Sequence, residues 1–527
     1  MTVEPGLPPG PQPVTRSGLA DLWCTMLAVD AVAGSDTFFS RGGHSLLASR
    51  MMARLRRTFG VPVPTALAFE TRTFDEFADA VLRFVGDFEP QCETGGEATS
   101  VRNVVTCGLT PQQSVLRVEA SPDVAENMTV VYRACGIRDL GRFRAALEAA
   151  IAAHAVFGLT IEFGDDGAPP LMRGPGPTRD RPRPVIAVQE DIAHGERALA
   201  RQHLTGADVT SGQAPAALVL PRGDGEVLIA LTTHHMFFDG HSAEVLLEDV
   251  ATAYVDPAGV TPSSYLAYAV RRTSEAARRR DDVLVEQWRA EHATRLSARL
   301  AAGAAEYRGP AGGILAELLV EVGPDAADRL RSRLQGRASM YSGLVALVAG
   351  CLRADAPSGA APVGVGVMFD NRVEDPGDGR TVGLFATSGL LLLEAGHAGL
   401  SAAAEVAHHE VASARRYSRL PLELLAAPFT GWPAAVDVVV VEDSGQPARK
   451  AGGATFALLS GREVRDYFPR YGSFSYGTTT TVTATGLNDG GGLVLRVEHP
   501  ARDRERMTRL VSRLRVELGP HATTRLG

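Results

Sequence analysis

The chain has few cysteines and almost no lysine, and its net charge is negative. Its 527 residues include five cysteines and no CxxC pair, so neither a disulfide framework nor a zinc site is predicted. The formal net charge is -8, and Lys450 is the single lysine. Because phosphate binding requires a basic surface, this charge argues against nucleic acid as a partner.

The sequence also lacks the apolar segments that enter membranes. The N-terminus, MTVEPGLPPGPQP, has neither the basic nor the apolar region of a secretion signal, and no run of about 18 uncharged apolar residues occurs. We therefore expect a cytoplasmic protein without a membrane partner. The composition, 45% hydrophobic and 22% charged, is typical of a globular protein, and at roughly 150 residues per domain the length predicts three or four folded units.

The spacing of apolar residues divides the chain into segments. Residues 1–15 are rich in proline and glycine and predict a flexible N-terminal segment. Residues 16–88 have helical spacing and predict a small all-α bundle, whereas residues 89–105 are polar and predict a linker. Strands and helices alternate afterwards, which predicts a two-lobed α/β body. We expect its first lobe at residues 106–275 and its second lobe at residues 276–527.

Ser45 lies in the stretch DTFFSRGGHSLLA, between a glycine pair and an apolar helix. Serine at this position can cap the helix by accepting a hydrogen bond from an unpaired backbone amide. The glycines also allow a sharp turn that exposes the hydroxyl, and a helix N-terminus stabilises an attached phosphate. The serine taken alone favours the helix cap, and the flanking glycines make the exposed hydroxyl the competing interpretation.

The same stretch resembles the attachment motif of peptidyl carrier proteins of nonribosomal peptide synthetases. These carriers are four-helix bundles in which a serine receives 4′-phosphopantetheine. The resemblance implies that Ser45 anchors this covalent arm and is not a nucleophile. It also implies a phosphopantetheinyl transferase as a partner.

Two adjacent histidines stand in the stretch THHMFFDG, in a chain with only 13 histidines. The preceding residues, EVLIALTT, alternate as a core strand, and helical spacing begins near Ser242. His234 and His235 are therefore predicted on a strand-to-helix loop, where side chains can face a cleft. The alternative is that they are hydrogen-bonded core residues at the end of a strand.

HHMFFDG matches the HHxxxDG signature of the condensation-domain superfamily, which resembles chloramphenicol acetyltransferase in fold. Further stretches extend this resemblance over residues 106–527: LTPQQSVL at 109–116, SSYLAYAV at 263–270, DNRVEDPGDGRTVGLFATS at 370–388 and YSRLPLELL at 417–425. The resemblance implies an acyltransferase of nonribosomal peptide synthesis, a route to antibiotics and other secondary metabolites. An enzyme of this family moves an aminoacyl or peptidyl group from a carrier-bound thioester to a nucleophile, usually an amine.

The resemblance also implies the roles of individual residues. His235 takes the catalytic role, as a general base or by orienting the nucleophile, and His234 is structural. Asp239 is expected to brace the loop through Arg372, and Gly240 to permit the close turn that follows. No metal is expected, because the attacked thioester is already activated.

Several family positions are altered in this chain. Leu159 and Ala217 stand near places where the family carries arginine, and FATSG at residues 385–389 replaces the more common FVNTL. We expect such changes to leave the fold intact and to affect the substrate.

Two other functions remain as alternatives. An epimerization domain shares the histidine motif and follows a carrier, but Met368 lies where that family's glutamate segment is expected, and GGHS is more typical of condensation domains than of epimerization domains. A non-catalytic docking module that recruits a tailoring enzyme usually loses the histidine pair, which this chain keeps. Amide formation, ester formation and release onto a soluble nucleophile are not separated by the sequence.

The order of the domains predicts the partners. A carrier that precedes a condensation domain normally supplies the donor, so the acyl group on Ser45 is expected to enter the cleft from one side. The sequence contains no adenylation domain, so we expect a separate adenylation protein to load the carrier. The acceptor is expected on another carrier or as a soluble amine or alcohol.

Overall fold

The structure is a computed structural model. It describes these residues: 13–27, 29–38, 41, 48, 51–52, 54–55, 58–59, 63, 67–87, 106–116, 127–164, 168–174, 185–189, 192–205, 209–210, 215–301, 316–334, 336–354, 361–372, 378–394, 399–443, 448–468, 480–486, 492–519 and 522–526. Residues 1–12, the whole predicted linker at residues 89–105, and Ser45 lie outside them.

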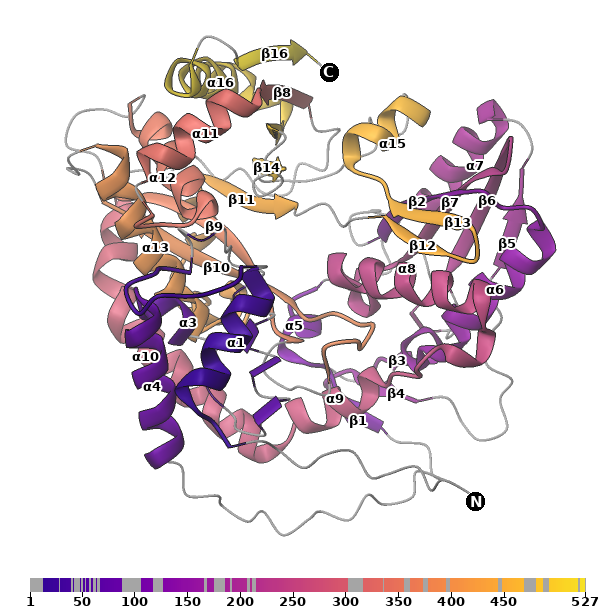
Figure 1. Ribbon diagram of the computed structural model, residues 1–527, viewed down its shortest axis with the longest axis horizontal. Coiled ribbons are helices and arrows are strands. Elements are labelled where there is room, and N and C mark those ends of the chain that lie inside the picture. Colours follow the sequence, from indigo (N-terminus) through magenta and orange to yellow (C-terminus); the bar gives the residue numbers. More distant parts are fainter. Residues whose placement is uncertain are drawn as a thin grey trace.

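An all-α unit begins the described chain, as predicted. Its helices include α1 (Arg16–Leu27), α3 (Leu67–Glu70) and α4 (Phe74–Asp87). The indole of Trp23 lies at the centre of its apolar core, with ring centroids 5.1 to 5.5 Å from those of three phenylalanines, Phe38, Phe74 and Phe77. These aromatic contacts hold α1 against α4, and the unit lies on one side of a larger body (Figure 1).

The first lobe is built on a six-stranded sheet with the order β12-β13-β2-β7-β6-β5. Along β6, Ala217 and Val219 enter the apolar cluster under α6 and α8, whereas Leu218 and Leu220 enter the cluster under α7 and α15. Because successive side chains of a strand point to opposite faces, helices cover both faces of this sheet. The elements are β2 (Asn127–Cys135), α6 (Leu140–Ala153), β5 (Val185–Val188), α7 (Ile192–Thr205), β6 (Ala216–Gly223), β7 (Glu226–His234), α8 (Gly240–Val255), β12 (Arg449–Ala451), β13 (Ala454–Leu458) and α15 (Gly461–Tyr467).

The second lobe is built on a seven-stranded sheet with the order β10-β9-β11-β14-β15-β8-β16. Leu391 and Leu393 of β10 pack with α12, α13 and α16, whereas Leu390 and Leu392 pack on the other face with α10. The elements are α10 (Glu275–Ala301), β8 (Ala316–Val322), α11 (Pro324–Arg333), α12 (Met340–Arg353), β9 (Val363–Asp370), β10 (Ala386–Leu393), α13 (Leu400–Arg416), β11 (Val438–Asp443), β14 (Thr481–Thr485), β15 (Leu493–His499), α16 (Arg504–Leu518) and β16 (Ala522–Leu526).

Short elements lie beside and between the lobes. A small sheet has the order β1-β4-β3, and the remaining helices are short. Their bounds are β1 (Thr106–Gly108), α5 (Pro111–Ser114), η1 (Ala155–Gly158), β3 (Thr160–Glu162), β4 (Leu171–Arg173), η3 (His235–Phe237), η4 (Pro257–Gly259), α9 (Tyr265–Arg272), α14 (Leu422–Leu425), η7 (Trp432–Ala435) and η9 (Ala501–Asp503). Among the described helices, none combines the length and the apolar character needed to cross a membrane.

Two segments from the second half of the chain belong to the first lobe. Strand β13 pairs with β2, with Thr455 opposite Cys135, and so adds its hairpin to the first sheet. Val382 and Leu384, which follow β9, lie in the apolar core of the first lobe. The expected assignment of all of residues 276–527 to the second lobe is therefore wrong for these segments. The physical reason is that the free edge of β2 is satisfied by a distant hairpin.

Candidate functional site

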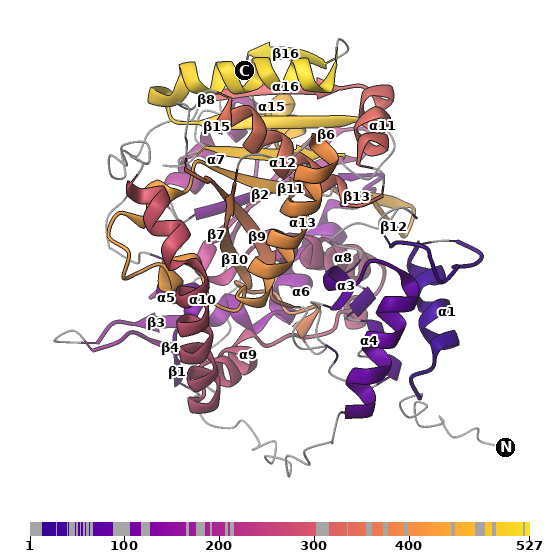
Figure 2. The same cartoon turned by 90° about the vertical axis from the view of Figure 1, so that its left-hand side faces the viewer.

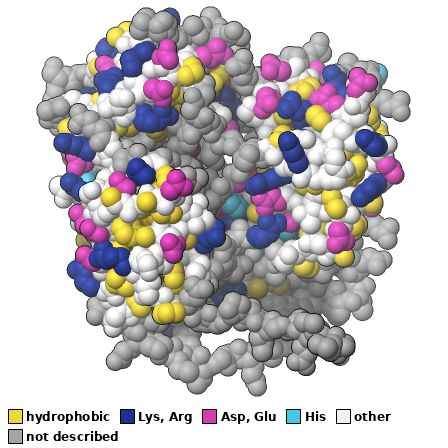
Figure 3. All heavy atoms as spheres, viewed as in Figure 1, with side chains coloured by type: hydrophobic (Ala, Val, Ile, Leu, Met, Phe, Trp, Pro, Cys, Tyr) yellow, Lys and Arg dark blue, Asp and Glu magenta, His cyan; other side chains and the backbone are white. Residues whose placement is uncertain are grey.

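The histidine pair lies where β7 ends, as the sequence predicted. His234 is the last residue of β7, His235 opens the single-turn helix η3, and α8 begins five residues later at Gly240. Both histidine side chains are partly exposed. Figure 3 shows a furrow between the two lobes with a histidine side chain visible inside it.

The two imidazoles have opposite tautomers, which their hydrogen bonds define. His235 Nδ1 lies 2.7 Å from the Phe238 carbonyl oxygen, which can only accept, so Nδ1 donates and Nε2 carries the lone pair. His234 Nδ1 accepts the backbone N–H of Met236 at 3.1 Å, so the proton of neutral His234 is on Nε2. Only His235 therefore offers an imidazole nitrogen that can accept a proton without breaking a contact of the loop.

The environment of His234 keeps its imidazole neutral. Burial and, to a smaller extent, the neighbouring His235 together lower the pKa of His234 to about 4. A group with this pKa does not hold a proton near neutral pH. This agrees with a structural role for His234.

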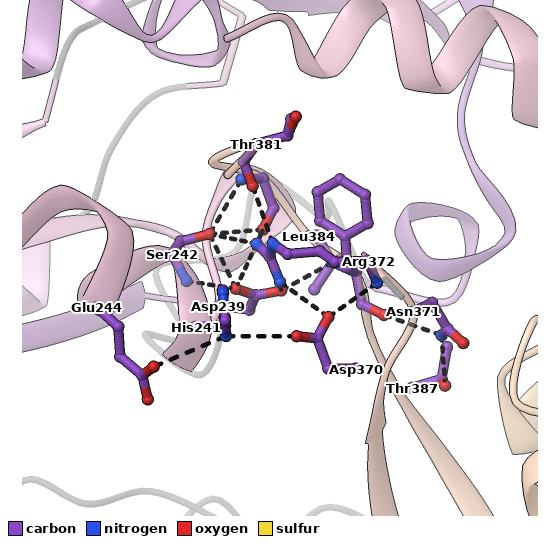
Figure 4. Close-up of polar contacts among 12 residues, drawn as sticks. Asp239, His241, Ser242, Glu244, Asp370, Asn371, Arg372, Thr381, Leu384 and Thr387 are labelled. Atoms are coloured by element: carbon purple, nitrogen blue, oxygen red, sulfur yellow. Dashed lines mark hydrogen bonds and ion pairs between the residues drawn. The ribbon is translucent and has the colours of Figure 1, made fainter. Parts of the chain in front are cut away.

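Asp239 and Arg372 form a buried bidentate ion pair between the two lobes (Figure 4). Arg372 Nη1 donates to Asp239 Oδ2 and Nη2 donates to Oδ1, each at 2.8 Å. The Asp239 carboxylate also accepts the backbone N–H groups of Ser242 at 2.8 Å and of Phe385 at 2.9 Å. Asp239 thus caps the first turn of α8 and at the same time holds the segment that follows β9.

The remaining donors of Arg372 are also satisfied inside the protein. Nε donates to the Thr381 carbonyl at 2.9 Å, Nη2 to the Gly383 carbonyl at 3.0 Å, and Nη1 to Asp370 Oδ1 at 3.1 Å. The guanidinium carbon lies 4.2 Å from the centre of the Phe385 ring, a favourable cation–π distance. Arg372 therefore fixes residues 381–385 against the start of α8.

The charges of this pair are matched. Burial opposes ionisation of Asp239, but the Arg372 guanidinium and the backbone hydrogen bonds from Phe385 and Ser242 outweigh it and lower the pKa of Asp239 to about 2. Burial lowers the pKa of Arg372, whereas Asp239 and Asp370 raise it, with a net rise above its ordinary value. Both groups are ionised at neutral pH, so the pair holds the loop after His235 in one position.

Gly240 does not have the role that the sequence suggested. Its backbone lies outside the left-handed region, and a Cβ added there would meet no atom within 4 Å. The turn before α8 is instead made by the Asp239 cap, so a glycine is not sterically required at position 240.

Two polar residues of the LTPQQ stretch hold the segments around the site. One contacts the histidine loop, and the other contacts the tyrosine that binds the segment after β9. Gln113 Nε2 donates to the carbonyl oxygen of Met236, next to His235, at 3.0 Å. Thr110 Oγ1 lies 3.2 Å from the Tyr265 hydroxyl, which donates to the Leu384 carbonyl at 2.9 Å. All three side chains are fully buried. The motif stands out in the sequence, but the role of these residues was missed because their partners are distant in the chain.

A second buried polar group joins α8 to its surroundings. His154 Nε2 lies 2.9 Å from Asp249 Oδ2, and His154 Nδ1 lies 2.9 Å from Ser263 Oγ. Arg380, from the segment after β9, binds the other oxygen of Asp249. His154 is therefore a hydrogen-bonded core histidine, and nothing in the sequence other than its apolar surroundings indicated this.

A third histidine follows the motif and lies close to the ion pair. His241 Nδ1 is 3.5 Å from Asp370 Oδ2 and 3.7 Å from Glu244 Oε2. Asp370 ends β9 in the second lobe, and its other oxygen binds Arg372. Figure 4 shows these side chains in a row beside the Asp239–Arg372 pair. His241 therefore adds a polar contact between the lobes.

The altered family positions lie in the core. Leu159 is 1% exposed and Ala217 is 0% exposed, and both belong to the apolar cluster of the first lobe. An arginine in either place would need a partner that the surrounding apolar side chains do not supply. These substitutions are therefore accommodated by packing.

Comparison with known families gives two matches in the predicted order. The family model for the phosphopantetheine attachment site matches residues 17–81, and that for the condensation domain matches residues 111–434. The second match covers more than half of the chain.

Individual relatives are long synthetases. The chain is 29% identical over 243 residues to the dimodular nonribosomal peptide synthase of Bacillus subtilis (strain 168), covering 45% of this chain and 10% of that protein. It is 47% identical over 77 residues to the phosphinothricin tripeptide synthetase PhsB of Streptomyces viridochromogenes, covering 15% of this chain and 6% of that protein. The chain thus spans a small fraction of the relatives that it matches.

Solved structures share the fold. The first condensation domain of the calcium-dependent antibiotic synthetase has a TM-score of 0.59 at 17% identity, covering 80% of this chain and 98% of that one. The condensation domain of the monacolin K polyketide synthase MokA has a TM-score of 0.60 at 15% identity, covering 79% and 98%. The chain therefore belongs to the condensation-domain family and carries a phosphopantetheine attachment domain in front of that domain.

Proposed function

We propose that the protein forms an amide bond in nonribosomal peptide synthesis, with the acyl donor carried on its own N-terminal domain and the acceptor supplied by another molecule. The observation that carries this proposal is the hydrogen bond from His235 Nδ1 to the Phe238 carbonyl. In the neutral imidazole it leaves the lone pair on Nε2, and the side chain is partly exposed, so Nε2 can serve as a base for an attacking amine.

The proposed reaction is nucleophilic acyl transfer. The amine nitrogen of the acceptor attacks the thioester carbonyl carbon, a carbon–nitrogen bond forms, and the carbon–sulfur bond breaks to release a thiol. His235 Nε2 accepts the proton that the amine nitrogen loses and returns it to the leaving sulfur, so protons balance over one turnover. A neutral imidazole suits both transfers near pH 7.

The other site residues are assigned to positioning. Asp239 and Arg372 fix the loop that follows His235, and Gln113 holds the Met236 carbonyl at its centre. None of the three is proposed to touch the reacting atoms. Their substitution is expected to lower the rate by moving His235, because small displacements of a catalytic group are costly.

The carrier role rests on Ser45. The match to the phosphopantetheine attachment family covers residues 17–81 and includes this serine, which lies outside the described residues. The phosphopantetheine arm supplies the thiol that holds the donor acyl group. We propose residues 16–88 as the carrier and residues 89–105 as the linker to the condensation domain.

Epimerization and non-catalytic docking are less well supported. Met368, where the epimerization family's glutamate segment is expected, has no proton-transferring group, and the histidine pair expected to be lost in docking modules is present with its hydrogen bonds. Ester formation differs only in the acceptor atom. An adenylation domain that loads the carrier and a phosphopantetheinyl transferase are the partners that this function requires.

The proposal can be tested by following the mass of the intact protein. Incubation with coenzyme A and a broad-specificity phosphopantetheinyl transferase should add one phosphopantetheine to the wild type and none to Ser45→Ala. Protein whose phosphopantetheine thiol has been loaded with an acyl group should then transfer that group to an amine, an alcohol or a second carrier. A product with inverted stereochemistry and no new bond would contradict the proposal and indicate epimerization. An ester product would show that the acceptor is an alcohol and not an amine.

A further inference from the structure

A carboxylate of the second lobe binds an arginine of the carrier. Glu405 on α13 lies with Oε1 2.8 Å from Arg72 Nη2, and Arg72 follows helix α3 of the carrier. The other oxygen of Glu405 lies 4.0 Å from Arg337 Nη1 of the second lobe. Glu405 is therefore held by an arginine of its own lobe and by one of the carrier. Helix α3 lies beside α13 in both views (Figures 1 and 2).

Two more contacts surround this ion pair. Thr37 Oγ1 of the carrier donates to the Gly336 carbonyl at 3.3 Å. Gly336 has a φ of 68°, a left-handed conformation that suits glycine. Ala412 of α13 is 6% exposed and belongs to the apolar core cluster of the carrier. The second lobe thus presents a surface with an apolar centre and a polar rim, formed by Gly336, Arg337, Glu405 and Ala412, which we call the carrier-docking surface.

We propose that the carrier-docking surface selects its carrier by the guanidinium at position 72, so that carriers with an acidic side chain there are rejected. This inference deepens the proposed function and rests on it for the identity of the docked domain as the donor. The occupant of this surface is the carrier of the same chain.

The exposed ion pair between Arg72 and Glu405 is better suited to discriminating between carriers than to binding one tightly. Arg72 is 66% exposed and Glu405 is 25% exposed, and exposed ion pairs contribute little to affinity but discriminate against a partner of the wrong charge. Because carrier and condensation domain share one chain, docking is intramolecular and needs little affinity. Thr37 and Arg72 also flank Ser45 in the sequence, so the contacts come from the chain on both sides of the attachment serine.

The contact can be tested without any chemistry at the active site. Lys450 is the single lysine of the chain, so Arg72→Lys introduces a nearly unique side-chain amine. A carbodiimide should then join the introduced amine to the Glu405 carboxylate, and peptide mass mapping should find the cross-link. The matched controls are Arg72→Lys combined with Glu405→Gln, and Arg83→Lys on α4, whose native arginine binds the Asp79 carbonyl of its own helix. A cross-link no more abundant than in these controls would overturn the docking surface.

Charge reversal tests selection in the loaded full-length protein. Arg72→Glu and Glu405→Arg are each expected to slow acyl transfer about fivefold or more, and the double variant to recover to within about twofold of wild type. Recovery supports selection by charge, whereas equal losses in all three variants contradict it. If the cross-link forms but neither wild type nor any variant transfers its acyl group, the docking contact is supported and the proposed function is contradicted.

Discussion

Replacing Asp239 by asparagine should strongly destabilise the contact between the lobes. The carboxylate accepts hydrogen bonds from Nη1 and Nη2 of Arg372, from the backbone N–H and the hydroxyl of Ser242, and from the backbone N–H of Phe385. An asparagine has one acceptor oxygen, and its NH₂ group would face the Arg372 donors. The guanidinium would then be buried without its main counter-charge.

The buried ion pair sets the size of this loss. Removing one partner of such a pair costs about 3–5 kcal/mol. The lowered pKa of Asp239 agrees in direction, because it shows that the folded protein favours the ionised carboxylate although burial opposes ionisation. Because Asp370 Oδ1 still lies 3.1 Å from Arg372 Nη1, we expect about 3 kcal/mol.

Hydrogen exchange measures this loss where it occurs. Peptides that cover residues 378–386 report the free energy of local opening, which should fall by about 3 kcal/mol in Asp239→Asn. The control is Glu275→Gln, which also turns a carboxylate into an amide but in an exposed pair with Arg279 on α10, and which should change stability by less than about 0.5 kcal/mol. Equal protection in the two variants would refute the reasoning.

Three further perturbations test other parts of the site. The His234 imidazole should titrate by NMR near pH 4. Because the unfolded chain binds this proton more readily, the free energy of unfolding should rise between about pH 4 and 6.5. His234→Gln should flatten that rise. Gly383→Ala, which drives a methyl group into a buried tyrosine ring, should lower the unfolding temperature, whereas Gly350→Ala, whose added Cβ meets nothing, should not. Gln113→Leu leaves the Met236 carbonyl without its side-chain donor, so it should cost about 1–3 kcal/mol and slow acyl transfer.

Much of the site could be predicted from the sequence because its signals are local. The alternating strand before His234 and the helical spacing after Ser242 placed the pair on a strand-to-helix loop, and β7 and α8 lie there. Arg372 was assigned to Asp239 from a resemblance alone, and the two side chains meet at 2.8 Å.

The rest depends on contacts between residues far apart in the chain. Gln113 and Met236 are separated by 123 positions, and no local pattern indicates that their atoms meet. The hairpin of β12 and β13 has ordinary strand character, so the sequence could not show that it joins the sheet of the other lobe. The prediction for Gly240 was wrong although its signal was local. A glycine in the motif suggested a close turn, but the Asp239 cap provides that turn.

The role of His235 as the base is the central claim, and single-turnover kinetics test it most directly. Protein loaded with an acyl group on Ser45 is mixed with an excess of amine, and the loss of the acyl group is followed by intact mass. His235→Ala should slow transfer by about 10²–10⁴-fold, while hydrogen exchange of residues 378–386 stays as in wild type. A variant that is equally well folded and transfers within about threefold of the wild-type rate would contradict the account.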